Sequence, residues 1–380
     1  MKTVLPPMHV GVIGGSYAGL ATALTLRQAG HKVELFERSE AASRVGGGIV
    51  VQPDFADYLE RNGYGSQQTI GVPTVRRRFL GPDGSVGHTT SDSVFYSGWD
   101  ALLRSLNDAL GEDGVHRGVA LTRFEQDGHG VTAEFSDGVS RRFDLLIGAD
   151  GVGSAVRSQL LPEVHPRYAG YVGYRGLIPE YELSAEAQAL IDQSFVLFAY
   201  PGSHILNYLI PGHHGELEPG QRRYNWVWYV NTDESRELPG ILTDLDGVRH
   251  RSSLGPGEMS PATLAYLTQH AEEKLPPTLR QVVQQTSEPF VQGIFDIQVD
   301  QMRFGRVLLL GDAASMVRPH TASGTSKAVG DATSLASHLI SGPTLDEALD
   351  YWEAERLAVA DRLGVYGQRI AANGGLGLAA

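Results

Sequence analysis

The sequence of 380 residues contains no cysteine, which excludes disulfide bonds, thiolate nucleophiles and cysteine metal sites. It has no apolar run long enough to span a membrane, and Met1–Met8 does not have the form of a signal peptide. Positive charge is scarce: 31 Lys and Arg stand against 44 Asp and Glu, a formal net charge of −13. Because nucleic acids and anionic membranes are also negatively charged, we do not expect this chain to bind them. We find no internal repeat and no metal-ligand spacing, and we expect a soluble cytoplasmic protein without a metal.

The N-terminal region predicts a dinucleotide-binding βαβ unit. An apolar strand pattern over 9–14 is followed by a turn of small residues, a helix pattern and a second strand that ends at Glu37. Such a turn lets the backbone approach a pyrophosphate at the positive end of a helix. Gly14, Ser16 and Gly19 take the positions of the glycine motif, with Ser16 in place of the middle glycine. Glu37 stands where an acid accepts ribose hydroxyls, roughly 20 residues on.

Arg38, next to Glu37, is a further cofactor-binding candidate, and the alternative for the whole unit is a turn that binds nothing. Two later segments favour binding. Each is a buried strand followed by a short polar motif: Asp150-Gly151 ends the segment 144–151, and Gly311-Asp312 lies within 306–314. In this order, the three segments indicate FAD held across nearly its whole length.

The last of these segments leads into a predicted helix over 325–340. Asp312 could accept a hydrogen bond from a ribityl hydroxyl of the flavin, or it could cap a helix instead. Ala322 and Gly324 lie at the start of the predicted helix, where backbone N–H groups could face the electron-rich edge of the flavin ring.

The rest of the chain alternates between strand and helix patterns. A helix over 98–110 places its leucines inward and leaves Arg104 on another face. The glycine-rich stretch 44–51 could lie along a flat ligand or be a plain loop. The other expected elements are a helix over 53–63, a hairpin over 74–90, three strands before 151, a β-rich aromatic region over 165–232, helices over 262–284 and 344–371, and a frayed tail over 373–380.

These patterns predict an α/β fold with a Rossmann-like FAD-binding domain, a discontinuous β-rich substrate domain and a long C-terminal helix. The expected pieces are 1–73, 92–166 and 286–343 for the FAD-binding domain, 74–91 and 167–285 for the substrate domain, and 344–380 for the C-terminal helix and tail.

The three motifs resemble those of the para-hydroxybenzoate-hydroxylase-like, single-component FAD monooxygenases over nearly the whole chain. Within that family, several segments resemble the 2,6-dihydroxypyridine 3-hydroxylase branch, which also carries serine at the second glycine position. These segments are Gly14-Gly15-Ser16, Gly48–Pro53, Tyr168–Val172, Arg175-Gly176 and Arg318-Pro319-His320. Family members commonly have Gly-x-Gly where this chain has Ala322-Ser323-Gly324, a difference that could alter the mobility of the flavin.

The resemblance implies a hydroxylase that uses NAD(P)H and O2, through a flavin C4a-hydroperoxide, on an electron-rich aromatic or N-heteroaromatic ring. A homodimer and the choice between NADH and NADPH are left open. The implied cofactor contacts are Gly14, Ser16, Gly19 and Glu37 with the ADP moiety, Arg104 near the pyrophosphate, Asp150 and Gly151 with FAD and NAD(P)H, Gly311 and Asp312 with the ribityl chain, and Pro319 to Gly324 along the ring.

The catalytic candidates come from the aromatic region and from the start of the last motif. His204 and Tyr208 are four residues apart on one strand and share a face, and His320 lies beside the expected flavin ring. Each is also compatible with a purely structural role. The strand 224–229 has Tyr224, Trp226 and Trp228 on one face and Asn225, Val227 and Tyr229 on the other, and the sequence leaves open which face lines the cavity.

Three alternatives use the same scaffold. They are a flavin-dependent reductase or desaturase, a halogenase with Trp226-Val227-Trp228 as its Trp-x-Trp motif, and a flavin-binding module without activity.

Overall fold

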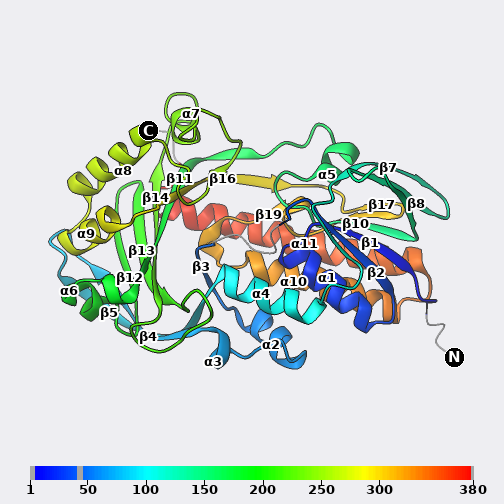
Figure 1. Ribbon diagram of the computed structural model, residues 1–380, viewed down its shortest axis with the longest axis horizontal. Helices are drawn as coiled ribbons and strands as arrows, with labels where there is room; N and C mark the ends of the chain where they lie inside the picture. Colours follow the sequence, from blue (N-terminus) through cyan, green and yellow to red (C-terminus); the bar gives the residue numbers. More distant parts are fainter. Residues whose placement is uncertain (1–4, 41–45, 378–380) are drawn as a thin grey trace.

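A computed structural model describes residues 5–40 and 46–377, and these residues form two main sheets that lie side by side (Figure 1). The first sheet has six strands and the second has ten, while a small sheet has three. The predicted α/β fold is confirmed, including the Rossmann-like unit, the β-rich layer and the long C-terminal helix. Among the described residues, no helix combines the length and the apolar character that crossing a lipid bilayer requires.

The first sheet has the strand order β17-β18-β10-β1-β2-β6, and all of its strands except β17 run parallel. Because parallel strands end at the same edge of a sheet, the segments after β1, β10 and β18 come together there. The strands are β1 His9–Ile13, β2 Lys32–Glu37, β6 Val115–Arg117, β10 Leu145–Gly148, β17 Arg303–Phe304 and β18 Val307–Leu309.

The second sheet has the order β15-β16-β11-β14-β13-β12-β4-β5-β3, and β19 pairs with β16. Its strands are β3 Gly48–Val50, β4 Val72–Leu80, β5 Val86–Gly98, β11 Arg167–Pro179, β12 Ser194–Tyr200, β13 Ser203–Ile210, β14 Arg223–Asn231, β15 Ser253–Leu254, β16 Phe290–Gln298 and β19 Ser315–Met316. The small sheet consists of β7 Leu121–Asp127, β8 Gly130–Phe135 and β9 Ser140–Phe143.

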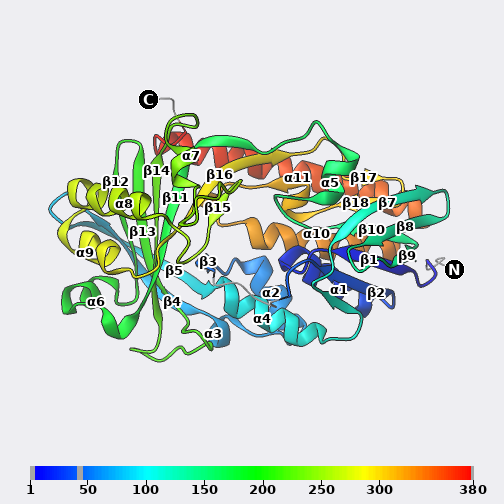
Figure 2. The ribbon, with the colours of Figure 1, turned by 45° about the horizontal axis from the view of Figure 1, so that its top comes forward.

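Helices cover both sheets, and Figure 2 shows the second sheet with α8 and α9 on one side and the first sheet with its helices on the other. The helices are α1 Tyr17–Gln28, α2 Pro53–Arg61, α3 Gln67–Ile70, α4 Trp99–Leu110, α5 Ala155–Leu160, α6 Ala185–Ile191, α7 Leu238–Ile241, α8 Pro261–Lys274, α9 Pro277–Gln285, α10 Gly324–Ser341 and α11 Leu345–Asn373. Short 3-10 turns span η1 Glu180–Glu182, η2 Gly311–Ala313 and η3 Pro319–Thr321.

Two local predictions were wrong. The single helix predicted over 262–284 is two helices, because Pro276 and Pro277 interrupt it and Leu275 is extended. The predicted fraying of the tail is also wrong for its described part. Leu376 is buried, and the N–H of Gly377 donates to the side-chain oxygen of Asn231 at 2.9 Å.

The boundaries of the sheets differ from the predicted domain pieces. β16 lies within the predicted FAD-binding piece 286–343 but pairs with β11 of the second sheet, and β5 continues past residue 91 to Gly98. β3 also joins the second sheet, although it lies in the predicted piece 1–73. The difference arises because strand pairing depends on contacts between distant segments, which local sequence patterns do not define. The division into FAD-binding and substrate domains therefore stays a proposal.

Candidate active site

The three predicted cofactor segments meet at one edge of the first sheet. Gly14 has a positive φ of 111°, and a side chain there would bring Cβ within 2.3 Å of the carbonyl oxygen of Ala149, just before Asp150. Gly311 likewise has a φ of 61°, and its Cβ would lie 2.6 Å from the Cβ of Ala18 in α1. The first segment therefore touches the second and the third, and only glycine fits at both contacts.

The start of α1 has the properties of an anion site. Ser16 is the residue before the helix, and its exposed side chain makes no cap hydrogen bond. The carboxylate of Glu37 lies against the turn: Oε2 accepts from the N–H of Gly15 at 2.7 Å and Oε1 from that of Ser39 at 2.8 Å. Arg38 is exposed just after β2. This places Glu37 beside the turn that would hold a pyrophosphate, where ribose hydroxyls would come within reach.

Asp150 holds its own loop in place. Its Oδ2 accepts from the N–H of Ala155 at 2.7 Å, at the start of α5, and its Oδ1 accepts from the hydroxyl of Ser154 at 2.5 Å. Burial raises the pKa of this carboxyl, and those hydrogen bonds oppose the rise. Arg157 on α5 then donates to the carbonyl oxygen of Ala313 at 2.9 Å, which joins the second segment to the third. A direct contact of Asp150 with FAD stays a prediction.

Asp312 lies in the middle of turn η2, between Gly311 and Ala313. Its side chain is exposed and accepts no hydrogen bond from the described residues. The alternative that Asp312 caps a helix is therefore wrong, because η2 begins after Leu310 and receives no side-chain cap. Surrounding protein raises the pKa of the carboxyl, while the charge of Lys327 lowers it. The free carboxylate is a suitable acceptor for a ribityl hydroxyl.

The start of α10 provides unpaired donors. Ala322 has a left-handed φ of 52°, and Ser323 precedes the helix without capping it by its side chain. The helix is 18 residues long, so its first N–H groups, near Gly324, carry the positive end of a substantial dipole. The hydroxyl of Ser326 is buried and has no partner among the described residues. Together with the free carboxylate of Asp312, these groups fit the polar atoms of FAD.

The two faces of β14 have different surroundings, and only one of them can line a site. In the antiparallel register, Asn225 lies beside Tyr208 and Tyr229 lies beside His204, so these side chains share a face of the sheet. Trp226 and Trp228 lie on the other face, fully buried against α8 and α9. The face with Asn225, Val227 and Tyr229 is therefore the one that can line a cavity.

His204 and His320 meet on this face. Their ring centroids lie 5.2 Å apart, and the ring of Tyr229 lies 4.4 Å from that of His320. The Nε2 of His320 is 2.9 Å from the hydroxyl of Tyr171. Burial lowers the pKa of His204 to about 4 and, with the charges of nearby cationic groups, that of His320 to about 3. Both imidazoles are therefore neutral near pH 7 and can donate or accept hydrogen bonds.

Two predicted site residues lie apart from the histidine pair. Tyr208 shares their face of β13 but is buried, with its ring 4.1 Å from that of Tyr96. Arg104 donates to the carbonyl oxygen of His213 at 2.6 Å and lies 3.5 Å from Asp100 on the same helix. Its guanidinium is thus bound to the loop after β13, and a contact with the pyrophosphate stays a prediction.

The sequence did not indicate a role for two residues of this region. Arg175, on β11, shares the face of His204, and Asp331, on α10, is fully buried beneath Gly311. The alternation of Tyr171, Gly173 and Arg175 along β11 is the signal that could have placed Arg175 on this face. No comparable signal marks Asp331. Residues 44 and 45 of the predicted glycine-rich stretch lie outside the described residues, and Gly48–Val50 forms β3.

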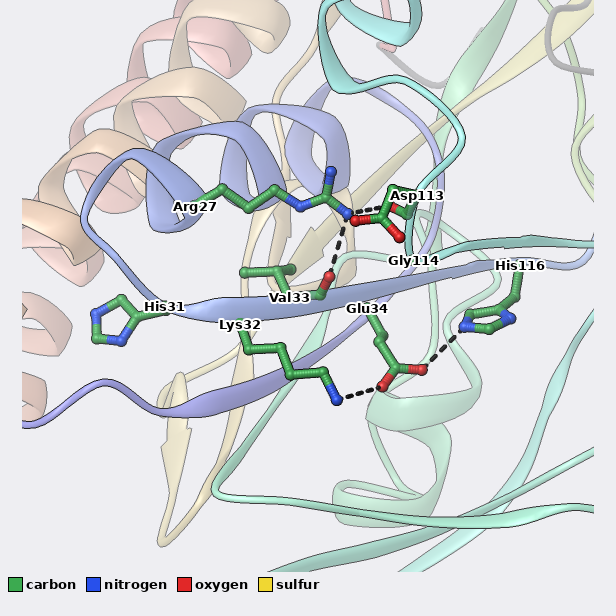
Figure 3. A pocket seen from close by; sticks show the side chains of 8 residues that line it. All are labelled: Arg27, His31, Lys32, Val33, Glu34, Asp113, Gly114 and His116. Atoms are coloured by element: carbon green, nitrogen blue, oxygen red, sulfur yellow. Dashed lines mark hydrogen bonds and ion pairs between the residues drawn. The ribbon is translucent and has the colours of Figure 1, made fainter.

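A separate pocket lies at the start of β2 (Figure 3). Glu34 pairs there with Lys32 at 3.6 Å and with His116 at 2.9 Å, and it accepts from His9 at 2.7 Å. Burial raises the pKa of Glu34, but the hydrogen bonds from both histidines outweigh it and lower the pKa. These groups pair with one another around Glu34, three residues before Glu37 on β2. Within the described ranges, no cluster of His, Asp or Glu has the form of a metal site.

Comparison with known proteins places this geometry among FAD-binding proteins. Sequence models described as "FAD binding domain" and "FAD binding domain-like" match residues 269–364 and 168–296. The chain is 35% identical over 352 residues to the 2,6-dihydroxypyridine 3-monooxygenase of Paenarthrobacter nicotinovorans, covering 92% of this chain and 87% of the relative. The solved structure of 2,6-dihydroxypyridine-3-hydroxylase from Arthrobacter nicotinovorans matches with a TM-score of 0.93 at 32% identity, covering 99% of this chain and 94% of that one. Klebsiella pneumoniae HpxO complexed with FAD and uric acid matches with 0.77 at 26% identity, covering 95% and 87%.

Proposed function

The chain belongs to the class A FAD-dependent aromatic hydroxylases, and from this premise we propose that it hydroxylates a hydroxypyridine-like ring with NAD(P)H and O2. FAD, when bound, supplies hydride acceptance and oxygen activation. The observation that carries the proposal is the neutral pair His204 and His320 among aromatic rings, next to the start of α10. Such a wall suits a flat substrate with a few oxygen or nitrogen atoms to orient.

The residues that hold the cofactor divide by the part of FAD they meet. The N–H groups at the start of α1 would bind the pyrophosphate, with Gly14 and Ser16 in the turn and Gly19 in the first turn of the helix. Glu37 would accept hydrogen bonds from the ribose hydroxyls. Asp312 would accept a hydrogen bond from the ribityl chain. The first N–H groups of α10 would stabilise negative charge on the flavin ring.

His204 and His320 position the substrate. A neutral imidazole has one N–H donor and one acceptor nitrogen, so the pair can bind both a ring hydroxyl and a ring oxo group. Tyr171 fixes His320 through the 2.9 Å contact of its hydroxyl with Nε2, which leaves Nδ1 of His320 for the substrate. The surrounding aromatic side chains exclude water from the reacting atoms.

The halogenase alternative gains no support from the Trp-x-Trp segment. The indole of Trp226 donates to the hydroxyl of Thr286 at 2.9 Å and that of Trp228 to Ser203 at 2.8 Å. Both indole N–H groups therefore have partners within the core, on the face of the sheet away from the histidine pair.

A labelled-oxygen experiment tests the proposal. With a panel of hydroxypyridines and hydroxybenzoates, isotopically labelled O2 and NAD(P)H, one labelled atom is expected in the product of at least one hydroxypyridine. Label that appears only in water or peroxide with every compound would refute hydroxylation and favour a reductase or desaturase.

A variant at His320 tests the positioning role. His320→Ala is expected to release more peroxide per NAD(P)H oxidised, because the substrate is held less well, whereas His129→Ala, at an exposed turn, should couple normally. Normal coupling in His320→Ala would contradict the proposal that His320 positions the substrate. It would not contradict the proposed hydroxylation itself.

Three further properties belong to the same proposal. We propose that the protein is cytoplasmic and that O2 is its second substrate. Light scattering tests whether it forms a homodimer.

A further inference from the structure

Among the described residues Arg175 has no carboxylate partner, whereas several other arginines with little exposed surface have one. Four other half-buried or buried arginines form close ion pairs, namely Arg222 with Glu180, Arg223 with Asp100, Arg318 with Asp296 and Arg356 with Asp331. Within residues 5–40 and 46–377, Arg175 forms no such ion pair, and its Nε is buried without a hydrogen-bond partner. A buried N–H donor without an acceptor is costly, so an acceptor that meets this guanidinium would be stabilising.

The register of the second sheet fixes where Arg175 points. On β11 it lies directly beside Val227 of β14, and Val227 in turn lies beside Leu206 of β13. The next row toward the histidine pair consists of Gly173, Tyr229 and His204, and the row on the other side contains Asn225 and Tyr208. Because residues directly opposite one another share a face, the guanidinium lies on the substrate face, between His204 and Tyr208 along the strands.

A second unpaired donor lies beside Arg175. Asn225 accepts a hydrogen bond from the N–H of Gly48 at 2.7 Å through Oδ1, but its Nδ2 is buried and has no partner among the described residues. A Cβ placed on Gly47 would lie 2.9 Å from Nη1 of Arg175 and 3.4 Å from Oδ1 of Asn225, so the two side chains meet under the same backbone. The electric field of Arg175 also reaches the hydroxyls of Tyr208 and Tyr229 and the ring of His320.

We infer that Arg175 and Asn225 form an oxyanion-binding subsite that binds the substrate ring through a deprotonated hydroxyl oxygen. This rests on the proposed function. A guanidinium and an amide N–H₂ are both donors only, so together they select an acceptor that carries negative charge. Binding the ring as the anion found in solution requires no proton transfer within the site. An anionic ring is richer in electrons, and it is therefore more reactive toward an electrophilic oxygen atom.

Ligand binding to the oxidised holoenzyme tests the subsite. The probes are 2,6-dihydroxypyridine, which can ionise, and 2,6-dimethoxypyridine, which has the same ring and no ionisable hydroxyl. Arg175→Met removes the charge and the donors while it keeps much of the side-chain length. Arg175→Lys keeps the charge without the planar fork. Arg167→Met, at the exposed start of the same strand, removes one charge outside the site.

Arg175→Met is expected to raise the Kd of the dihydroxy compound about 10- to 100-fold, the scale of a hydrogen bond to a charged group. It should leave the Kd of the dimethoxy compound and that of FAD unchanged, and Arg175→Lys should lie between wild type and Arg175→Met. The pKa of the bound dihydroxy compound can be measured from its absorbance as a function of pH. In the wild type and in Arg167→Met, this pKa should lie below that of the free compound. In Arg175→Met, it should be close to that of the free compound.

Each other outcome overturns the inference in its own way. An equal loss for both probes would make Arg175 a packing residue, and a rise in the Kd of FAD with unchanged probe binding would assign it to the flavin. A wild-type enzyme that binds the dihydroxy compound with an unshifted pKa would overturn the subsite alone. A wild-type enzyme that binds no hydroxypyridine would overturn the proposed function as well.

Discussion

The carboxylate of Asp331 accepts a hydrogen bond from the backbone N–H of Gly311 at 2.9 Å, from a position 20 residues further along the chain. The same carboxylate pairs with Nζ of Lys327 at 3.0 Å and with Nε of Arg356 at 2.7 Å, and all three side chains are buried. Lys327 also donates to the carbonyl oxygen of Gly311 at 3.1 Å. This cluster fixes both polar groups of the Gly311 backbone and so determines where Asp312 is presented.

Asp331→Asn should destabilise the protein strongly. It removes the charge that two buried cations share, and breaking a buried pair by removing one partner costs about 3–5 kcal/mol. Chemical denaturation of the FAD-free protein measures the loss, and Asp361→Asn, at an exposed position on α11, is the control. Equal unfolding free energies for both variants would show that the cluster is not structural.

Asp312→Asn should weaken FAD binding while it leaves the apoprotein intact. The carboxylate has no partner among the described residues, so its loss should change the unfolding free energy by no more than about 0.5 kcal/mol. The Kd of FAD should rise about 10- to 100-fold, because a hydrogen bond to a charged acceptor is lost. A lower Tm of the apoprotein with an unchanged Kd would reverse this assignment.

Glu37→Ala should also weaken FAD binding by about one to two orders of magnitude, for the same reason. Fluorescence titration of the apoprotein with FAD measures the change. Glu40→Ala, three residues later and exposed, should bind FAD like the wild type. If the two variants bind FAD equally well, Glu37 serves only the turn through the N–H groups of Gly15 and Ser39.

Ala322→Gly should stabilise the protein slightly. The left-handed conformation costs a residue with a Cβ roughly 1–2 kcal/mol, whereas glycine loses about 0.4–1 kcal/mol through the entropy of the unfolded chain. A net gain between zero and about 1.6 kcal/mol is expected. Ala354→Gly, exposed within α11, should instead lose about 1 kcal/mol. Thermal denaturation compares them, and a loss of similar size in both would mean that the φ of 52° at Ala322 carries no strain.

Stability should decrease in mild acid because of the histidine pair. The pKa of His204 is lowered to about 4 and that of His320 to about 3, from an ordinary value of 6.5. The unfolded chain therefore binds protons first, so this contribution is complete above pH 6.5 and is lost as the pH falls toward 4 and 3. The unfolding free energy of His320→Gln should fall less steeply below pH 6.5 than that of the wild type or of His129→Gln. Parallel curves for all three would exclude the effect.

Much of the cofactor site could be predicted from the sequence. The turn at Gly14, the Asp150-Gly151 segment and the turn at Gly311 each follow a strand within a few residues, so local patterns mark them. Their meeting follows from topology, since adjacent parallel strands end at one edge. The roles of the individual side chains toward FAD stay predictions, and the capping role considered for Asp312 was wrong.

The sequence by itself determined that this chain builds a dinucleotide-binding unit and an aromatic sheet, because strand alternation and small-residue turns are short-range properties. It could not determine which face of β14 lines the site. Alternation gives two faces, and α8 and α9 pack on one of them. These helices begin more than 30 residues after Trp228 in the chain. Only the tertiary structure brought His204 to His320, placed Asp331 beneath Gly311 and left Arg175 without a carboxylate among the described residues, because each of these features depends on how distant elements pack.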